Sequence, residues 1–213
     1  MPIMTRRTLA ATAAAVIVAA GFAAAQAQQM APMAPANPPV RIRATIETVN
    51  GPMLTAKSRD GAELKVKLAD NAPVNEVVPV TLADIKDNSY IAVTAQPQPD
   101  GSQKAVAILI FPEALRGTGE GFRPWDLEPN STMTNATVAE QVKSTDGQTI
   151  TVKYKDGDKK VLVTPATIIV TYKKSAASDL KAGQKIFVAA AKKLDDGTLE
   201  APNVAYGDVG VWR

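Results

Sequence analysis

The chain has 213 residues, of which 46% are hydrophobic and 21% are charged, and this composition excludes a wholly disordered protein. It contains neither cysteine nor histidine, which excludes disulfides, thiolate nucleophiles, Ser-His-Asp triads and zinc sites built on these side chains. The formal net charge of +3 is too small to indicate nucleic-acid binding.

The N-terminus has the pattern of a signal peptide over residues 1–27. Arg6 and Arg7 form a positively charged start, and an uncharged, alanine-rich run follows to residue 25. Ala25-Gln26-Ala27 fits cleavage before Gln28. The apolar run is short and weakly hydrophobic for a membrane anchor. We therefore expect an exported bacterial protein, soluble in the periplasm, and the arginine pair leaves both Sec and twin-arginine export open.

Two stretches have neither a helical nor a strand period. Residues 28–39 are rich in Met, Ala and Pro, which predicts a flexible leader. Residues 112–134 carry three glycines, three prolines and Trp125. We expect this second stretch to be a connector between two folded parts.

The first folded part, residues 40–111, has the pattern of a small β-unit. Its apolar residues alternate with polar ones, and Asn50-Gly51 and Asp60-Gly61 are hairpin signals between its first strands. Pro73 and Pro79 indicate edge positions in a less regular fourth stretch. One helical turn capped by Thr81 and two apolar strands complete the unit.

Residues 135–213 repeat this pattern. Ala136 echoes Ala44 at an offset of 92 residues, and Asp196-Gly197 echoes Asp100-Gly101 at an offset of 96, after an insertion around Asp146-Gly147. Landmarks in the same order indicate an internal repeat. Three strands, an irregular crossing, a short helix and two strands are the order of an OB-type barrel. We therefore predict an all-β protein of two tandem OB-like five-stranded barrels, with a simple β-sandwich half as the alternative.

The repeat resembles a family of exported bacterial OB-like modules of unknown function. The resemblance lies in the opening T-I-x-x-V-x-G-x-x-L at residues 45–54 and in the D-L-K-x-G turn at residues 179–183. The stretch GTGEGFRPWDLEPNSTMTNATV looks like alphaproteobacterial periplasmic proteins, some labelled as metal ABC transporter components. The first repeat departs from the turn pattern, because Asn88 stands where the second has Gly183. The resemblance implies no reaction, no cofactor and no site residues.

The connector holds the candidate interaction residues Arg123, Trp125 and Asp126. A connector tryptophan can bury its ring between two domains. The alternative is a platform for a ligand or partner, with Arg123 as an anion donor. The nearby glycines of residues 117–121 do not make a phosphate loop, since no lysine and no helical pattern follow them.

Three acidic pairs and one basic-aromatic pair are further candidate sites. The pairs Asp156/Asp158 and Asp195/Asp196 fall at turns, where Asp is expected for backbone reasons. The third pair, Asp126/Glu128, lies in the connector. Tyr172 beside Lys173 is a combination found on nucleic-acid-binding OB surfaces. A solvated strand edge explains this lysine better, and we expect no nucleic-acid partner.

These observations predict a non-catalytic periplasmic protein that binds a protein or a small ligand of the cell envelope. A metal- or small-ligand-associated component of a transporter is an alternative, which only the family resemblance favours. A hydrolase that uses paired carboxylates is another. No metal or cofactor is expected, and the mature chain has no apolar run long enough to span a bilayer.

The signal-peptide assignment predicts that protein isolated from the periplasm begins near Gln28, because signal peptidase removes the segment before it. N-terminal sequencing measures this directly. Intact Met1 on membrane-embedded material would contradict both the cleavage and the localisation.

Overall fold

The computed structural model describes residues 38–144 and 147–211. The predicted signal peptide and most of the predicted leader lie outside the described residues, as do Asp146 and Trp212. The described part is all-β, with strands and only three short 3-10 helices. Its strands are β1 Val40–Asn50, β2 Met53–Ser58, β3 Glu63–Leu68, β4 Val74–Pro79, β5 Tyr90–Pro97, β6 Gln103–Ile110, β7 Gly121–Pro124, β8 Thr132–Ser144, β9 Gly147–Tyr154, β10 Gly157–Val163, β11 Ile168–Ser175, β12 Lys185–Lys193, β13 Leu199–Ala201 and β14 Val204–Tyr206.

Five strands close into a barrel, which we call the first ring. Its order is β1, β2, β3, β13 and β12, and the antiparallel pairing of β12 with β1 closes it. The predicted alternation explains the inner face, because Ile42, Ala44 and Ile46 are buried while Arg41 and Arg43 face outward. The apolar core of this ring takes side chains from both ends of the chain.

A second ring closes in the same way from β8, β9, β10, β6 and β5. Here β6 pairs in parallel with β10 and β5 pairs with β8. Its core is separate and includes Ile91, Ile108, Val138 and Ile150, all buried. The barrel architecture and the hairpin signals at Asn50-Gly51 and Asp60-Gly61 thus agree with the sequence.

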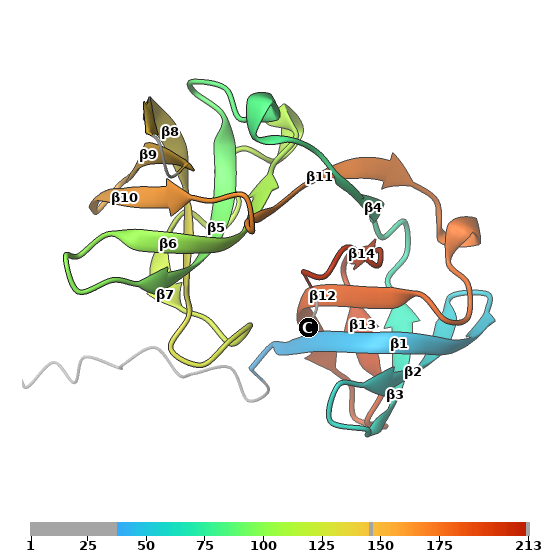
Figure 1. Ribbon diagram of the computed structural model, residues 1–213. Helices are drawn as coiled ribbons and strands as arrows, with labels where there is room; N and C mark the ends of the chain where they lie inside the picture. Colours follow the sequence, from blue (N-terminus) through green and yellow to red (C-terminus); the bar gives the residue numbers. More distant parts are fainter. Residues whose placement is uncertain (1–37, 145–146, 212–213) are drawn as a thin grey trace, which may run out of the picture. The chain divides into compact units, whose positions relative to one another are not determined.

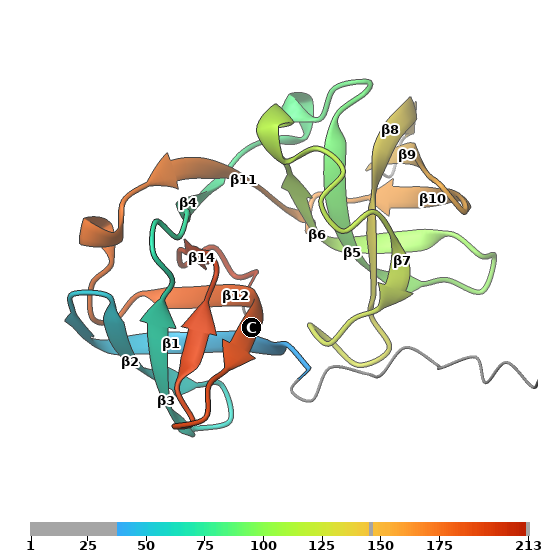
Figure 2. The ribbon, with the colours of Figure 1, turned by 180° about the vertical axis from the view of Figure 1, so that it is seen from behind.

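The tandem arrangement is not confirmed, because the two repeats exchange strands. The first ring combines β1–β3 of the first repeat with β12 and β13 of the second. The second ring combines β8–β10 of the second repeat with β5 and β6 of the first. Figure 1 shows blue β1 beside red-orange β12, and green β5 and β6 grouped with β8–β10; Figure 2 shows the same grouping from behind. The boundaries 40–111 and 135–213 therefore do not separate two barrels.

The exchange takes place at β4 and β11, which occupy equivalent positions in the two repeats. They pair antiparallel, and Val77 lies opposite Tyr172 at the centre of the pairing. Pro79 was expected to mark an edge, but β4 pairs with β11 on one side and β14 on the other. Strand β14 pairs with β4 only as far as Glu76, and after that residue β4 pairs, among the described strands, with β11 alone. Pro79 therefore lies where β4 has a neighbouring strand on one side only.

The short helices follow the same exchange. Helix η1 (Leu82–Asp84) follows Thr81, whose N–H and hydroxyl donate to the Asp84 carboxylate at 2.8 and 2.7 Å. Helix η3 (Ala177–Asp179) is its counterpart. After η1, Ile85 packs in the second ring, and after η3, Leu180 packs in the first. The residue after each helix therefore packs in the ring whose first three strands come from the other repeat.

The departure at Asn88 has a backbone explanation. Asn88 and Gly183 both have positive φ angles, of 67° and 87°. Asparagine is among the few residues that tolerate this left-handed conformation. Asn88 N–H donates to the Val138 carbonyl, and Gly183 N–H donates to the Ile46 carbonyl, so both turns join the exchanged strands to the partner repeat.

The connector is more structured than expected. Helix η2 (Glu113–Leu115) and strand β7 lie within residues 112–134, and β8 already begins at Thr132. Strand β7 pairs with the first part of β8, with Arg123 opposite Met133. Two of its four residues are Gly121 and Pro124, and so the sequence shows no alternating pattern there.

Strand exchange predicts that the halves stay together after the chain is cut between them. A protease recognition sequence inserted after the exposed Gly117, followed by cleavage, should leave one species on size exclusion that unfolds in a single transition. Neither half contains a complete ring, so neither can leave without opening both barrels. The uncut insertion variant is the control. Two separately folded species after cleavage would contradict the exchange.

Candidate functional site

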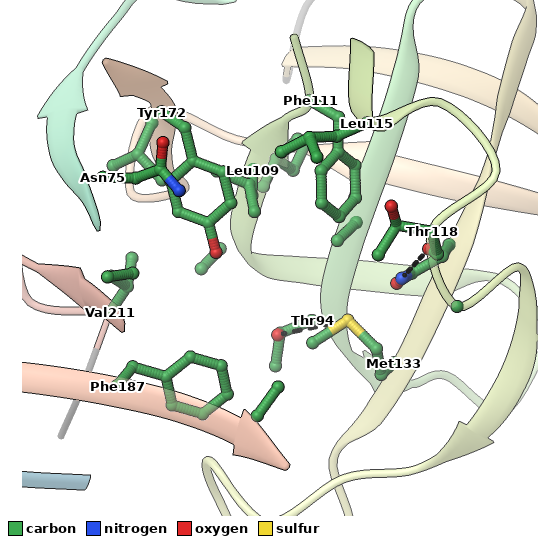
Figure 3. Close-up of a pocket in the computed structure, with 18 of the residues that line it drawn as sticks. Asn75, Thr94, Leu109, Phe111, Leu115, Thr118, Met133, Tyr172, Phe187 and Val211 are labelled. Carbon is green, nitrogen blue, oxygen red and sulfur yellow. Dashed lines mark hydrogen bonds between the residues drawn. The ribbon is translucent and has the colours of Figure 1, made fainter. Parts of the chain in front are cut away.

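A cavity of about 340 Å³ lies where side chains of both rings meet. Its volume is in the range of small-molecule sites. Figure 3 shows Tyr172, Phe111, Phe187, Val211 and Met133 around it. The lining is mainly apolar, and its described residues are Arg43, Pro73, Asn75, Ala92, Thr94, Ala107, Ile108, Leu109, Phe111, Leu115, Thr118, Gly119, Arg123, Trp125, Leu127, Met133, Asn135, Val170, Tyr172, Phe187, Ala189, Asn203, Ala205 and Val211.

Aromatic rings form one wall of the cavity. Tyr172 and Phe111 pack edge to face with their ring centroids 6.2 Å apart. The Tyr90 ring packs against Phe111 with a centroid distance of 5.4 Å. Burial raises the pKa of Tyr172 to about 12, so its hydroxyl stays neutral at physiological pH. Lys173, the next residue of the strand, lies on the opposite face of the sheet, where it forms an ion pair with Glu76 at 3.3 Å. The suggested Tyr172–Lys173 surface therefore does not exist as one face.

Trp125 lies at the stem of the loop between β7 and β8 and is half-buried. The Arg41 guanidinium stacks 3.9 Å from the centre of its ring, and Phe187 of β12 packs edge to face at 6.5 Å. Phe187 is the strand partner of Arg43. Trp125 therefore contacts the outer surface of the first ring and also lines the cavity.

The loop that carries Trp125 is held by its own hydrogen bonds. Trp125 N–H donates to the Ser131 carbonyl at 2.8 Å, and the buried Ser131 hydroxyl donates to the Glu128 carbonyl at 2.8 Å. Gln96 of β5 donates to the Glu128 carboxylate at 3.1 Å. Leu127 turns inward and is buried. These contacts fix the loop, so that Trp125 and Asp126 reach the first ring in one conformation.

Asp126 binds both outward-facing arginines of β1. Arg43 donates two hydrogen bonds to it, Nη1 to Oδ2 at 2.8 Å and Nη2 to Oδ1 at 2.9 Å, and Arg41 lies 3.0 Å away. The hydrogen bonds from Arg43 hold the pKa of the Asp126 carboxyl well below its ordinary value of 3.8. Asp126 is thus a charged anchor for the loop, and Glu128, its proposed carboxylate partner, binds Gln96 instead.

Arg123 joins Arg41 and Arg43 around the Trp125 ring. Its guanidinium lies 5.7 Å from the Trp125 ring centre and donates to the Gly119 carbonyl at 2.8 Å. Burial lowers the pKa of Arg123, and the nearby positive charge of Arg41 lowers it further. The arginine group, Arg41, Arg43 and Arg123 with Asp126, therefore carries an excess of positive charge in a half-buried place.

Two buried polar atoms in the cavity wall have no hydrogen-bond partner among the described residues. They are Arg43 Nε, a donor, and Asn135 Oδ1, an acceptor. The Arg43 side chain is only 8% exposed and Asn135 only 5%. Asn135 Nδ2 donates to the Thr118 carbonyl at 2.9 Å, which fixes the orientation of the amide. A buried polar group without a partner costs free energy, so these atoms mark where a ligand or water would bind.

The glycine-rich segment is part of this site and is not a phosphate loop. Strand β7 follows it instead of a helix. A Cβ on Gly119 would lie 3.2 Å from Asn135 Nδ2 and 3.4 Å from Arg123 Nη2, and its φ angle is +56°. Glycine therefore keeps the space between these two side chains open.

The acidic pairs at the turns do not form a site. Asp196 caps the turn after β12 by accepting hydrogen bonds from Thr198, and Asp100 does the same for Ser102 at the equivalent turn. Asp156 lies in the turn between β9 and β10. Within residues 38–144 and 147–211, no three acidic side chains come together as a possible metal site.

Sequence analysis selected Arg123, Trp125 and Asp126, and the structure brings all three together. It missed Arg41 and Arg43, which lie 82 and 80 positions earlier than Arg123. Their outward positions in β1 were visible in the alternation. What the alternation could not show was that the connector loop folds back onto that face.

No protein-family model, curated protein or solved structure matches this chain. None of the helices in the part that the structure describes is long and apolar enough to cross a membrane.

The contacts of Trp125 predict that Trp125→Ala destabilises the fold by about 2 kcal/mol, since a half-buried indole removes roughly 100 Å² from water. Urea unfolding followed by far-UV circular dichroism measures this.

Phe122→Ala is the matched control, because Phe122 is also an aromatic of the connector but is 41% exposed. We expect a change within about 0.5 kcal/mol there. Equal, small effects at both positions would mean that Trp125 contributes only to ligand binding.

Proposed function

We propose that this protein is a non-catalytic binding module of the bacterial cell envelope that holds a small, largely apolar ligand in the cavity between its rings. The observation that carries the proposal is the combination of an apolar cavity of about 340 Å³ with the partnerless polar atoms of Arg43 and Asn135. Apolar pockets with a few convergent polar groups are typical of small-molecule sites.

The chemistry of the wall supports binding rather than catalysis. Its described ionisable side chains are arginines and Tyr172. Arginine remains protonated in proteins, and Tyr172 has a pKa raised to about 12. General acid–base catalysis near neutral pH needs a group that titrates close to that pH. The described part of the wall contains no carboxylate and no lysine that could supply one.

The envelope location rests on the sequence of the N-terminus. Its charged start, apolar run and Ala25-Gln26-Ala27 site favour export and cleavage. We further propose that both rings are OB-like barrels. The five-strand order and the short helix before the last two strands support this, with the strand exchange as a departure from one barrel per repeat.

A neutral fluorescent probe tests the cavity. We expect N-phenyl-1-naphthylamine to bind with one site per chain and enhanced fluorescence. Ala189→Phe, which places a ring in the lining, should weaken binding at least tenfold. Ala190→Phe is the control, because the neighbouring alanine is also exposed but does not line the cavity. If both variants bind as the parent does, or if the parent does not bind, the cavity is not the site.

A further inference from the structure

Two arginines line a cavity whose wall is mainly apolar, and this combination bears on the chemistry of the ligand. Arg43, Arg123 and Trp125 all line the cavity. Leu109, Val170 and Val211 line it without polar side-chain atoms. A ligand with one polar end and an apolar body would suit both the arginines and the apolar side chains of this wall. This inference rests on the proposed function and specifies the ligand of the same site.

The polar end meets positive charge in excess. Asp126 neutralises at most one of the three guanidiniums that lie around Trp125. Asp126 itself is not among the cavity-lining residues, whereas Arg43 and Arg123 are. Asp126 occupies both terminal nitrogens of Arg43, so Arg123 is the lining arginine that binds no carboxylate among the described residues. A half-buried excess charge of this kind is stabilised by an anion.

The available donors suit a small oxyanion. Both terminal nitrogens of Arg43 are used by Asp126, which leaves its buried Nε. Arg123 uses Nη1 for the Gly119 carbonyl. Its Nη2 lies 3.4 Å from the place where a Gly119 Cβ would be, next to the Asn135 amide. The absent side chain of Gly119 leaves room beside these donors.

We propose that the ligand is an organic anion, with a carboxylate-type head that accepts hydrogen bonds from Arg43 Nε and Arg123 and an apolar body among the aromatic and aliphatic side chains. Charge-assisted hydrogen bonds from arginine to carboxylate are strong, and they gain strength away from water. The apolar body supplies affinity through burial, and the head fixes its direction in the cavity.

Matched pairs of an anion and a neutral alcohol test the head group. Decanoate is compared with 1-decanol, and 2-naphthoate with 2-naphthalenemethanol, by displacement of N-phenyl-1-naphthylamine from the full-length mature protein. In at least one pair we expect the anion to bind tenfold or more tightly than the alcohol, as a charged hydrogen bond predicts. The two pairs distinguish a linear body from an aromatic one.

Variants assign the preference to the arginine group. Arg123→Gln should weaken binding of the preferred anion about tenfold and leave the alcohol unchanged. Lys174→Gln removes the same charge from an exposed position outside the cavity and is the control, with no change expected. Asp126→Asn should tighten anion binding, because it frees Arg43 from a competing carboxylate. Melting curves by circular dichroism verify that each variant is folded.

The outcomes separate the two proposals. Equal affinity for anion and alcohol in both pairs, with the neutral probe still bound, overturns the anionic head and leaves the cavity as a binding site. An anion preference that survives Arg123→Gln and Asp126→Asn unchanged also overturns it, because the charge would then act from elsewhere. Absence of probe binding to the parent overturns the proposed function, and this inference with it.

Discussion

The antiparallel pairing of β4 with β11 is the constraint on which the rest of the structure depends. It is where both repeats leave the ring that they began, with Val77 opposite Tyr172 at the centre. Each barrel core is consequently built from residues distant in sequence, and neither core is complete without both repeats. A third apolar cluster, with Val77, Val170 and Ala205, surrounds this crossing. Small units that bury limited apolar area alone gain stability by sharing it in this way.

The cavity depends on the same arrangement. One wall comes from the first ring through Arg43 and Phe187, and the opposite wall comes from β5, β6 and β8 of the second. The loop between β7 and β8 joins the two through the bidentate Asp126–Arg43 pair. A surface ion pair contributes little stability by itself. Its role here is geometric, because it holds Trp125 against β1 and leaves the remaining donors of the arginine group toward the cavity.

Local pattern predicted the strands well and their partners poorly. Alternation placed Ile42, Ala44 and Ile46 inward because side-chain direction in a strand depends only on neighbours in sequence. The assignment of strands to barrels depends on which copy of a repeated edge a strand meets, and two similar repeats offer nearly equal choices. Sequence identified the repeat but could not distinguish pairing within it from exchange between copies. Strand β7 was missed because four residues containing Gly121 and Pro124 carry too little period.

The candidate site shows the same division between local and distant information. Trp125 was selected because tryptophan is rare in the chain, and Asp126 because it is the next residue. Arg43 belongs to the site only because it binds Asp126, more than eighty residues away in the sequence. Asn135 is buried in the wall and was not selected as a site residue. Its proposed role follows from an acceptor atom that has no donor among the described residues, which only coordinates can reveal.

Strand exchange also determines the order in which the chain can fold as it emerges from the ribosome. Val40 pairs with Ala191, so the first barrel cannot close until nearly all of the polypeptide has been synthesised. A domain with such distant contacts has a high contact order and folds slowly. An early half therefore exposes an incomplete sheet for as long as translation continues.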